Sequence, residues 1–460
     1  MAHRRRCTIA GVASTEVTGL KAFAANSDWL AEEGLRLDAT AYVSGGLQAR
    51  DKILSRNGDC KPLNKVSRIF YEGRFARNYV QNADHGVPFF TASDMTLANL
   101  QGLRLLSKKK SPNLSVLQVH SGWTLMSRSG TIGRMVYARG EMEGMSASDD
   151  IIRIIADQSE VRPGFLFAFL SGHLAQAMIA QRTYGSVIQH IEPHHIADLP
   201  IPLPDKAFAE RIHALVESAA GKRTKAALLL QDAAKYFDNL AGPMILTHDH
   251  SRSAGIVRSD QLAGRLDAFH HIGWAAEPHF GGGDRIDDIA NVIASSRVPR
   301  IYVKKGIPFL SGIDIFKLRP TSRTHIAKFI AEQFDACVKR GQLAVQGSGS
   351  RSGLIGRVAY IGARMDGWAA SHDLFRIAAS DAADIARIFA FLTAESGHRI
   401  MLKHSYGTAI PHVNPQGIAA LRIPSLPQQL VEGAARALVL REEADAEEAL
   451  AIEEVEVWLN

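Results

Sequence analysis

The heptapeptide RSGTIGR at residues 128–134 returns as RSGLIGR at residues 351–357, a separation of 223 positions (351 − 128 = 223). Other stretches return in the same order at similar separation: RLDA at 36–39 and 265–268, GVPFFTASDM at 86–95 and GIPFLSGIDI at 306–315, FAFL at 167–170 and 389–392, and TYGSVIQHIEPHHIADLPIP at 183–202 and SYGTAIPHVNPQGIAALRIP at 405–424. Matched order at matched spacing indicates internal duplication. We interpret the chain as two copies of a unit of about 220 residues.

The composition is that of an ordinary globular protein with a basic balance. Of 460 residues, 46% are hydrophobic and 22% are charged, and the formal net charge of +6 permits a polyanionic partner without requiring one. The first residues, MAHRRRCTIAGVAS, lack the apolar core of a secretory signal, and no apolar run reaches the ~18–20 residues that span a bilayer. We therefore expect a cytoplasmic protein without a membrane partner. The scattered Cys7, Cys60 and Cys337 argue against a disulfide framework or a zinc site.

Each copy mixes strand and helix patterns. The segments GVPFF and GIPFL predict buried strands, and the residues around each heptapeptide predict a strand, a tight turn and a second strand. Apolar helices are predicted at 163–181 and 385–403, and a strand punctuated by proline closes each module. The predicted fold class is α+β, with two tandem mixed α/β modules.

A long segment free of proline follows each module. Between 206 and 240 apolar residues recur at heptad spacing, and 428–460 is rich in Ala, Leu and Glu. A helix over the first segment would be roughly 50 Å long and needs a partner. Two copies of such a unit pair most simply about a pseudo-two-fold axis, which makes the helices antiparallel. The expected seam of the first helix is Ile212, Leu215, Ala219, Ala226, Leu229, Ala233, Tyr236 and Leu240, interrupted by Lys222.

The predicted domain organisation follows from these segments. It consists of an unassigned N-terminal segment 1–34, a first module 35–204, a central spacer helix 205–241, a linker 242–262, a second module 263–427 and a C-terminal spacer helix 428–460.

The charges of the two helices predict a register. If facing residue numbers add to about 667, the basic cluster KRTK at 222–225 meets the acidic cluster REEADAEE at 441–448. Lys222 then lies opposite Asp445, and Lys225 opposite Glu442. One polar position within such a seam often determines register and direction.

Taken together, these features resemble the specificity (S) subunit of type I restriction–modification systems. The resemblance rests on SGTIGR with SGLIGR, on YGSVIQHIEPHHIADLPIPLP with YGTAIPHVNPQGIAALRIPSLP, and on the two long helices, and it covers residues from about 35 to the end. It implies two target-recognition domains that each read half of a bipartite site in double-stranded DNA, spaced by the helix pair as an antiparallel coiled coil. It also implies two modification subunits that methylate adenine N6 with S-adenosylmethionine, and a separate restriction and translocase subunit.

The resemblance further implies that this chain catalyses nothing and holds no cofactor. In agreement, the sequence lacks the Pro-Pro dipeptide of an adenine methyltransferase loop and the phosphate-binding loop of an ATPase. Three histidines in HIEPHH could suggest a metal site, but His194 and His195 correspond to Gln416 and Gly417 in the second copy. We therefore predict no metal site.

Candidate DNA contacts fall into two groups. The stretches that differ most between the copies are basic, and sequence reading is expected there. The repeated heptapeptide is either a hairpin turn that the module reuses or a turn that faces DNA phosphates. A solvated charged face is the alternative for the first group. The candidates are Lys108, Lys109, Lys110, Arg319, Arg323 and Lys328 in the divergent stretches, and Arg128, Arg134, Arg351 and Arg357 at the heptapeptides.

The sequence leaves alternatives to this function open. The chain is either a subunit that directs methylation or a specificity-like DNA-recognition component of another phage-defence complex, without methylation. A stand-alone enzyme would rest only on scattered His and Asp residues.

Overall fold

The computed structural model describes most of both modules and both long helices. The described residues are 45–111, 114–183, 190–242, 282–350 and 353–460, apart from 57, 295–296 and 408–409, with a few isolated positions before 45 and between 256 and 266. The N-terminal segment and the linker predicted from the sequence lie largely outside this range, as does Arg351.

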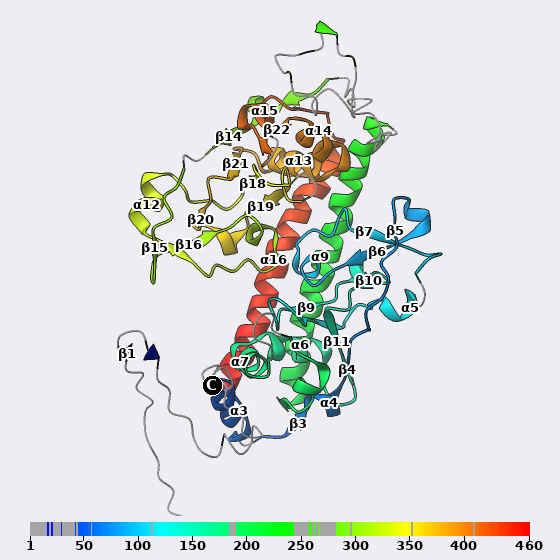
Figure 1. Cartoon of the computed structure of the whole chain (residues 1–460), viewed down its shortest axis with the longest axis vertical. Helices are drawn as coiled ribbons and strands as arrows, with labels where there is room; N and C mark the ends of the chain where they lie inside the picture. Colours follow the sequence, from blue (N-terminus) through cyan, green and yellow to red (C-terminus); the bar gives the residue numbers. More distant parts are fainter. Residues whose placement is uncertain are drawn as a thin grey trace, which may run out of the picture.

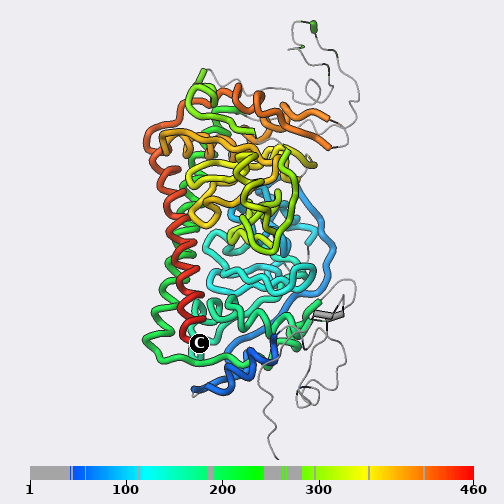
Figure 2. Tube along the Cα trace, turned by 90° about the vertical axis from the view of Figure 1, so that its left-hand side faces the viewer, coloured from blue at the N-terminus to red at the C-terminus, as the bar shows by residue number. Residues whose placement is uncertain are grey.

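Two long helices, α9 (Lys206–Ala241) and α16 (Gln428–Leu459), lie side by side along one side of the molecule, and the modules occupy the other side (Figures 1 and 2). The helices run antiparallel. Ile212, early in α9, shares a hydrophobic cluster with Val455, late in α16, whereas Phe237, late in α9, shares one with Val431. The side chain of Asp205 caps α9 by accepting a hydrogen bond from the backbone N–H of Phe208 at 2.9 Å.

The first module contains two four-stranded sheets. One has the order β4-β11-β8-β9 and is antiparallel, and the other has the order β10-β6-β7-β5. The strands of these sheets are β4 (Ser67–Phe70), β5 (Tyr79–Val80), β6 (Gly86–Phe90), β7 (Arg104–Ser107), β8 (Thr124–Ser127), β9 (Met135–Tyr137), β10 (Ser146–Ala147) and β11 (Ile151–Ala156). Further elements are α3 (Gly46–Leu54), β3 (Cys60–Pro62), α4 (Leu63–Val66), α5 (Leu114–Leu117), α6 (Pro163–Ser171), α7 (His173–Gln181), α8 (Pro193–Ile196) and β12 (Pro200–Pro202).

The second module repeats this plan. Its sheets have the orders β14-β21-β18-β19 and β15-β17-β16-β20. The strands are β14 (Asn291–Ile293), β15 (Tyr302–Val303), β16 (Ile307–Leu310), β17 (His325–Ile326), β18 (Leu343–Gln346), β19 (Val358–Tyr360), β20 (Ala369–Ala370) and β21 (Leu374–Ala378). Further elements are β13 (Asp284–Arg285), α11 (Ile286–Ile289), α12 (Lys328–Gln333), α13 (Ala382–Thr393), α14 (Glu395–Lys403), β22 (Ser405–Tyr406), β23 (His412–Val413), α15 (Pro415–Ala419) and β24 (Arg422–Ile423). The mixed α and β content predicted from the sequence is confirmed.

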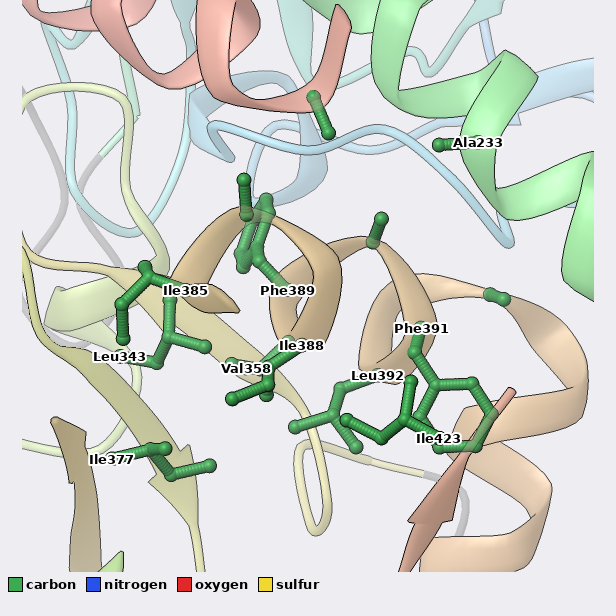
Figure 3. Packing of buried hydrophobic residues seen from close by; sticks show 14 of the residues in the cluster. Ala233, Leu343, Val358, Ile377, Ile385, Ile388, Phe389, Phe391, Leu392 and Ile423 are labelled. Carbon is green, nitrogen blue, oxygen red and sulfur yellow. The ribbon is translucent and has the colours of Figure 1, made fainter. Parts of the chain in front are cut away.

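The repeated FAFL motif fills the space between each sheet and the helix pair. In α13, the Phe391 ring of this motif lies 5.3 Å from the Phe237 ring of α9. The preceding Ile385 and Ile388 lie against the sheet residues Leu343 and Val358 (Figure 3). The corresponding residues of α6, from Phe165 to Leu170, are buried in the core of the first module. Burial of each large apolar side chain stabilises the fold by about 1.5–3 kcal/mol, which accounts for a motif kept in both copies.

The two modules also meet directly, through a short antiparallel pairing. Leu97 forms a β-bridge with Lys317. The N–H of Ala98 donates to the carbonyl of Phe316 at 2.9 Å, and the N–H of Leu318 donates to the carbonyl of Thr96 at 2.7 Å. Because the copies are offset by 220 here, Leu97 pairs with its own repeat counterpart (317 − 97 = 220). Such self-pairing is the property of a two-fold axis.

The helix pair differs in detail from the predicted register. The ammonium of Lys222 binds Glu447 at 2.6 Å and Glu443 at 3.1 Å, not Asp445. Arg223, rather than Lys222, is the polar residue buried in the seam, because the buried stripe of α9 passes through Ala219, Ala220, Arg223 and Ala226. An α-helix repeats every 3.6 residues, so a strict heptad pattern drifts from the buried face over this length. Leu240, expected in the seam, is 48% exposed.

The second predicted pair is also absent. Lys225 is exposed, and Glu442 binds the guanidinium of Arg340 and accepts a hydrogen bond from the hydroxyl of Tyr360 at 3.1 Å. Glu442 thus anchors the second module to α16. Tyr137 of the first module makes the matching contact with Glu217 of α9.

No single helix in the described part of the chain has the length and apolar character of a membrane span. The bent pair α6 and α7 reaches that length and composition only when the two helices are taken together.

Candidate nucleic-acid interface

Arginines from both modules converge at one place, which we call the basic junction. A cavity of about 310 Å³ is lined there by Arg134 of the first module and by Arg300 and Arg323 of the second. Burial and the nearby charge of Arg323 lower the pKa of Arg134, while Asp314 opposes this shift. Among the described residues, none of the three guanidinium groups has a carboxylate within ion-pair distance. Asp314 and Asp373 line the same cavity, so three arginines against two aspartates leave a modest positive balance (3 − 2 = 1) that suits a polyanion.

The heptapeptide holds Arg134 in position through a tight turn. The N–H of Ser127 donates to the carbonyl of Arg134 at 3.0 Å, and the N–H of Gly133 donates to the carbonyl of Ser127 at 3.1 Å. Gly133 has φ +80°, and a Cβ there would lie 3.0 Å from the side chain of Gln176 in α7. Only glycine combines this backbone conformation with this close approach. The hairpin reading of the heptapeptide is thus supported, with the final arginine projecting from it.

Two predicted contacts have partners inside the protein. The Arg128 side chain is 16% exposed, binds Glu192 at 2.5 Å and lies 4.2 Å from the Tyr71 ring centre. Burial opposes the charge of Arg128, but Glu192 outweighs it and raises the pKa. The guanidinium of Arg319 lies 3.3 Å from Glu448 and also donates to the carbonyl of Met135. Both arginines therefore have structural partners within the protein.

The remaining predicted residues are at three separate places. Lys108, Lys109 and Lys110 are exposed in the turn after β7, and the ammonium of Lys108 donates to the carbonyl of Asp84 at 3.0 Å. Lys328 is exposed at the start of α12, 3.6 Å from Glu332. Arg357 is half-buried and lines a different cavity from Arg134. Of the ten predicted contacts, Arg134 and Arg323 are brought together at the basic junction.

A buried charge cluster connects the second module to the helix pair near the basic junction. Arg223 binds Glu448 at 2.5 Å and Asp445 at 2.7 Å, and its side chain is 5% exposed. Burial opposes the charge of Arg223, yet the two carboxylates outweigh it and raise its pKa. Arg319 reaches the same Glu448 from the second module. The cluster therefore ties the second module to both helices, and Arg319 ties it to the first module.

Sequence reasoning missed a pair of buried arginines that support the sheets. Arg153 donates to the carbonyls of Leu117 and Ala147, and burial lowers its pKa to about 10. Its repeat counterpart, Arg376 (376 − 153 = 223), donates to the carbonyl of Cys337 at 2.8 Å and binds Asp335 at 2.6 Å. The shared arginine of DDIIRI and HDLFRI was the available signal.

The histidine cluster is used for capping. The Nδ1 of His195 accepts a hydrogen bond from the N–H of Glu192 at 3.0 Å, which completes a capping box at the start of α8. Within the described residues, no group of three or more His, Cys, Asp or Glu side chains is arranged to hold a metal ion.

Most of the first module and of α9 match the model of a known family. Residues 61–227 match the family model described as the type I restriction modification DNA specificity domain. This part of the chain is therefore similar to the DNA-specificity domain of type I restriction–modification systems, which agrees with the resemblance noted in the sequence.

Solved structures show a more distant likeness. The S subunit of a type I system from M. genitalium is 11% identical, with 88% of this chain and 95% of that chain covered and a TM-score of 0.28. The HsdS subunit from Thermoanaerobacter tengcongensis is 13% identical over 88% and 96%, with a TM-score of 0.27. A third structure, which describes complex assembly and conformational transition of the type I R-M system, is 12% identical. The match covers 88% of this chain and 97% of that chain, with a TM-score of 0.27. No curated protein sequence matches the chain.

Proposed function

We propose that the chain is the non-catalytic subunit that directs a partner adenine-N6 methyltransferase to a bipartite DNA site. The observation that carries this proposal is the repeated module placed twice about a pseudo-two-fold axis, with Leu97 meeting its own counterpart Lys317. Two equivalent but divergent modules fit a site made of two different half-sequences at constant spacing. In this proposal each module is a target-recognition domain, and α9 and α16 form the coiled-coil spacer between them.

The partners follow from the same symmetry. Two equivalent halves offer two equivalent docking surfaces, which fits two modification subunits. S-adenosylmethionine belongs to those subunits. A restriction and translocase subunit is a further proposed partner, and the proposed location of the complex is the cytoplasm.

The basic junction is the proposed phosphate-binding surface. Arg134, Arg300 and Arg323 supply fork-shaped donors that suit phosphate oxygens and carry no sequence information. Sequence reading belongs to residues that differ between the modules, and the exposed Lys108–Lys110 turn and Lys328 are the proposed candidates.

Methylome sequencing tests this function. Cells that carry the chain and its partner methyltransferase are expected to methylate two short sequences separated by a fixed number of unread base pairs. A single continuous motif, or no methylation when the complex co-purifies intact, would contradict the proposal. As a matched control, exchange of the divergent stretch 316–340 for that of another specificity protein should change one half of the motif and leave the other unchanged.

A further inference from the structure

A second cavity lies on the pseudo-two-fold axis, and we call it the axial cavity. It measures about 620 Å³ and is bounded by both modules and both long helices. Figure 1 shows the two modules meeting in front of α9 and α16, the elements that contribute Arg223 and Arg441 to this cavity. Its volume falls within the range of small-molecule sites, which is about 300–1,000 Å³.

The carboxylates that line the axial cavity already have partners. Glu442 binds Arg340 and Tyr360, and Asp445 binds Arg223. Glu141 binds Arg139 at 2.6 Å, and Asp94 accepts hydrogen bonds from the backbone and hydroxyl of Thr91. Glu442, Asp445 and Glu141 are thus each neutralised by an arginine, whereas Asp94 has neutral donors and keeps its charge.

Four arginines of the cavity lack such a partner. Within the part of the chain that the structure describes, Arg104, Arg357, Arg364 and Arg441 have no carboxylate within ion-pair distance, and Arg104 lies 4.6 Å from the Tyr79 ring centre instead. The guanidinium of Arg441 lies 5.6 Å from the Phe389 ring centre, and that of Arg357 lies beside Gly102 of the first module. Arg357 and Arg441 are half-buried. Partly desolvated cations without a counter-charge are costly, and a bound anion would reduce that cost.

Apolar side chains also line the axial cavity, beside the polar Asn99 and Gln101. Leu97 and Phe316 are half-buried at the module junction, and Met365 and Phe389 line the same space. Arg364 is exposed, so the cavity opens to solvent at this residue. A flat ring can lie against Phe316 and Leu97 while an anionic group reaches the arginines.

We propose that the axial cavity binds a phosphorylated small molecule of mononucleotide size, with its phosphates on Arg357, Arg364 and Arg441 and its ring against Phe316 and Leu97. Arginine forks match phosphate oxygens in pairs, and three of them suit a group with a charge of about −2 or more. Because residues from both modules line the cavity, the bound ligand stabilises the arrangement in which the modules touch.

Calorimetric titration of the full chain with ADP, adenosine and pyrophosphate tests the proposal. ADP is expected to bind and to raise the melting temperature, pyrophosphate to bind more weakly, and adenosine to bind least. Arg357→Gln and Arg441→Gln are each expected to weaken ADP binding roughly ten- to hundredfold, the worth of a lost charge-assisted hydrogen bond. If Arg441→Gln does not fold, Arg364→Gln at the exposed rim replaces it.

The matched control is Arg134→Gln, the repeat counterpart of Arg357 (357 − 134 = 223). This variant should keep the affinity for ADP within about twofold, since Arg134 does not line the axial cavity. Absence of ADP binding by a folded wild-type chain at millimolar concentration would overturn the proposal. An equal loss in Arg134→Gln and Arg357→Gln would also overturn it, since it would indicate general polyanion binding. Neither result bears on whether the methylated site is bipartite.

Discussion

The two copies of the heptapeptide build the same turn and then place its last arginine in different surroundings. Gly133 and Gly356 adopt φ of +80° and +73°, and each packs against the helix that follows the repeated FAFL motif. Arg134 then lines the basic junction, whereas Arg357 lines the axial cavity. The turn is therefore a shared folding device, and the arginine that leaves it is where the copies have diverged in use.

Charges at the axis show the same divergence. Arg223 corresponds to Asp445 on α16 (445 − 223 = 222), and the two bind each other. Glu141 corresponds to Arg364 (364 − 141 = 223). In a dimer of identical units a residue on the axis meets its own copy, so like charges would repel. Fusion of the units in one chain allows opposite charges to face each other there.

Charge reversal at the axis is expected to have the largest effect. Arg223→Glu places a third carboxylate beside Glu448 and Asp445, and unpaired buried charges of this kind cost about 3–5 kcal/mol. Urea unfolding followed by circular dichroism measures the loss. Adding Glu448→Arg restores opposite charges and should recover part of it. Strictly additive losses would contradict the charge-pair explanation.

The next largest effect is a pH dependence of stability that arises from His398 in the second module. Burial and the charge of Arg357 lower the pKa of His398 to about 4, below the value of 6.5 for a free histidine. The unfolded chain then binds more protons between these values, so stability is lost as pH falls from 6.5 toward 4, by about 2–3 kcal/mol. The counterpart in the first module is Gln176 (398 − 176 = 222). His398→Gln should therefore flatten the curve of unfolding free energy against pH. An unchanged curve would show that another group causes the pH dependence of stability.

A smaller effect is expected at the basic junction. Arg134→Gln should weaken DNA binding by roughly three- to tenfold for every sequence and reduce the slope of log affinity against log salt by about one. Arg357→Gln should weaken it less, because that guanidinium lies in the other cavity. Fluorescence anisotropy at several salt concentrations checks both variants. A larger loss in Arg357→Gln would reverse the assignment of the two arginines.

The smallest effect tests the helix register. Lys222→Glu is expected to cost less than about 1 kcal/mol, because the side chain lies at the edge of the helix pair. Glu447→Lys should rescue it, whereas Asp445→Lys should not, since Lys222 binds Glu447 and Glu443. Thermal unfolding of the single and double variants measures the coupling. Coupling of Lys222 with Asp445 alone would restore the register inferred from the heptad pattern.

Local patterns predict much of this fold. The hairpin turns and both long helices follow from glycine spacing, absence of proline and apolar periodicity. The register of the helix pair cannot be predicted in this way. A shift of one residue exchanges Lys222 for Arg223 in the seam, and both residues are basic. The pattern specifies the face of a helix, and packing of the partner decides which residue on it is buried.

The site is less predictable than the fold. Arg128 and Arg319 resemble solvent-facing cations in sequence, since their partners Glu192 and Glu448 are distant along the chain. Arg134 and Arg323 come together only through the contact between modules, which no local pattern encodes. Arg300 carries no repeat signal of its own.

The antiparallel helix pair also determines the order in which the protein can complete its folding during synthesis. Ala451, Val455 and Leu459 complete the hydrophobic core of the first module, and the Trp458 ring stacks on Phe208 with centroids 5.4 Å apart. The ribosome makes these residues after the whole second module. Domains generally fold as units from the N-terminus during translation. Here the first module has to wait for the end of α16, so the part of the protein made first is the last to be finished.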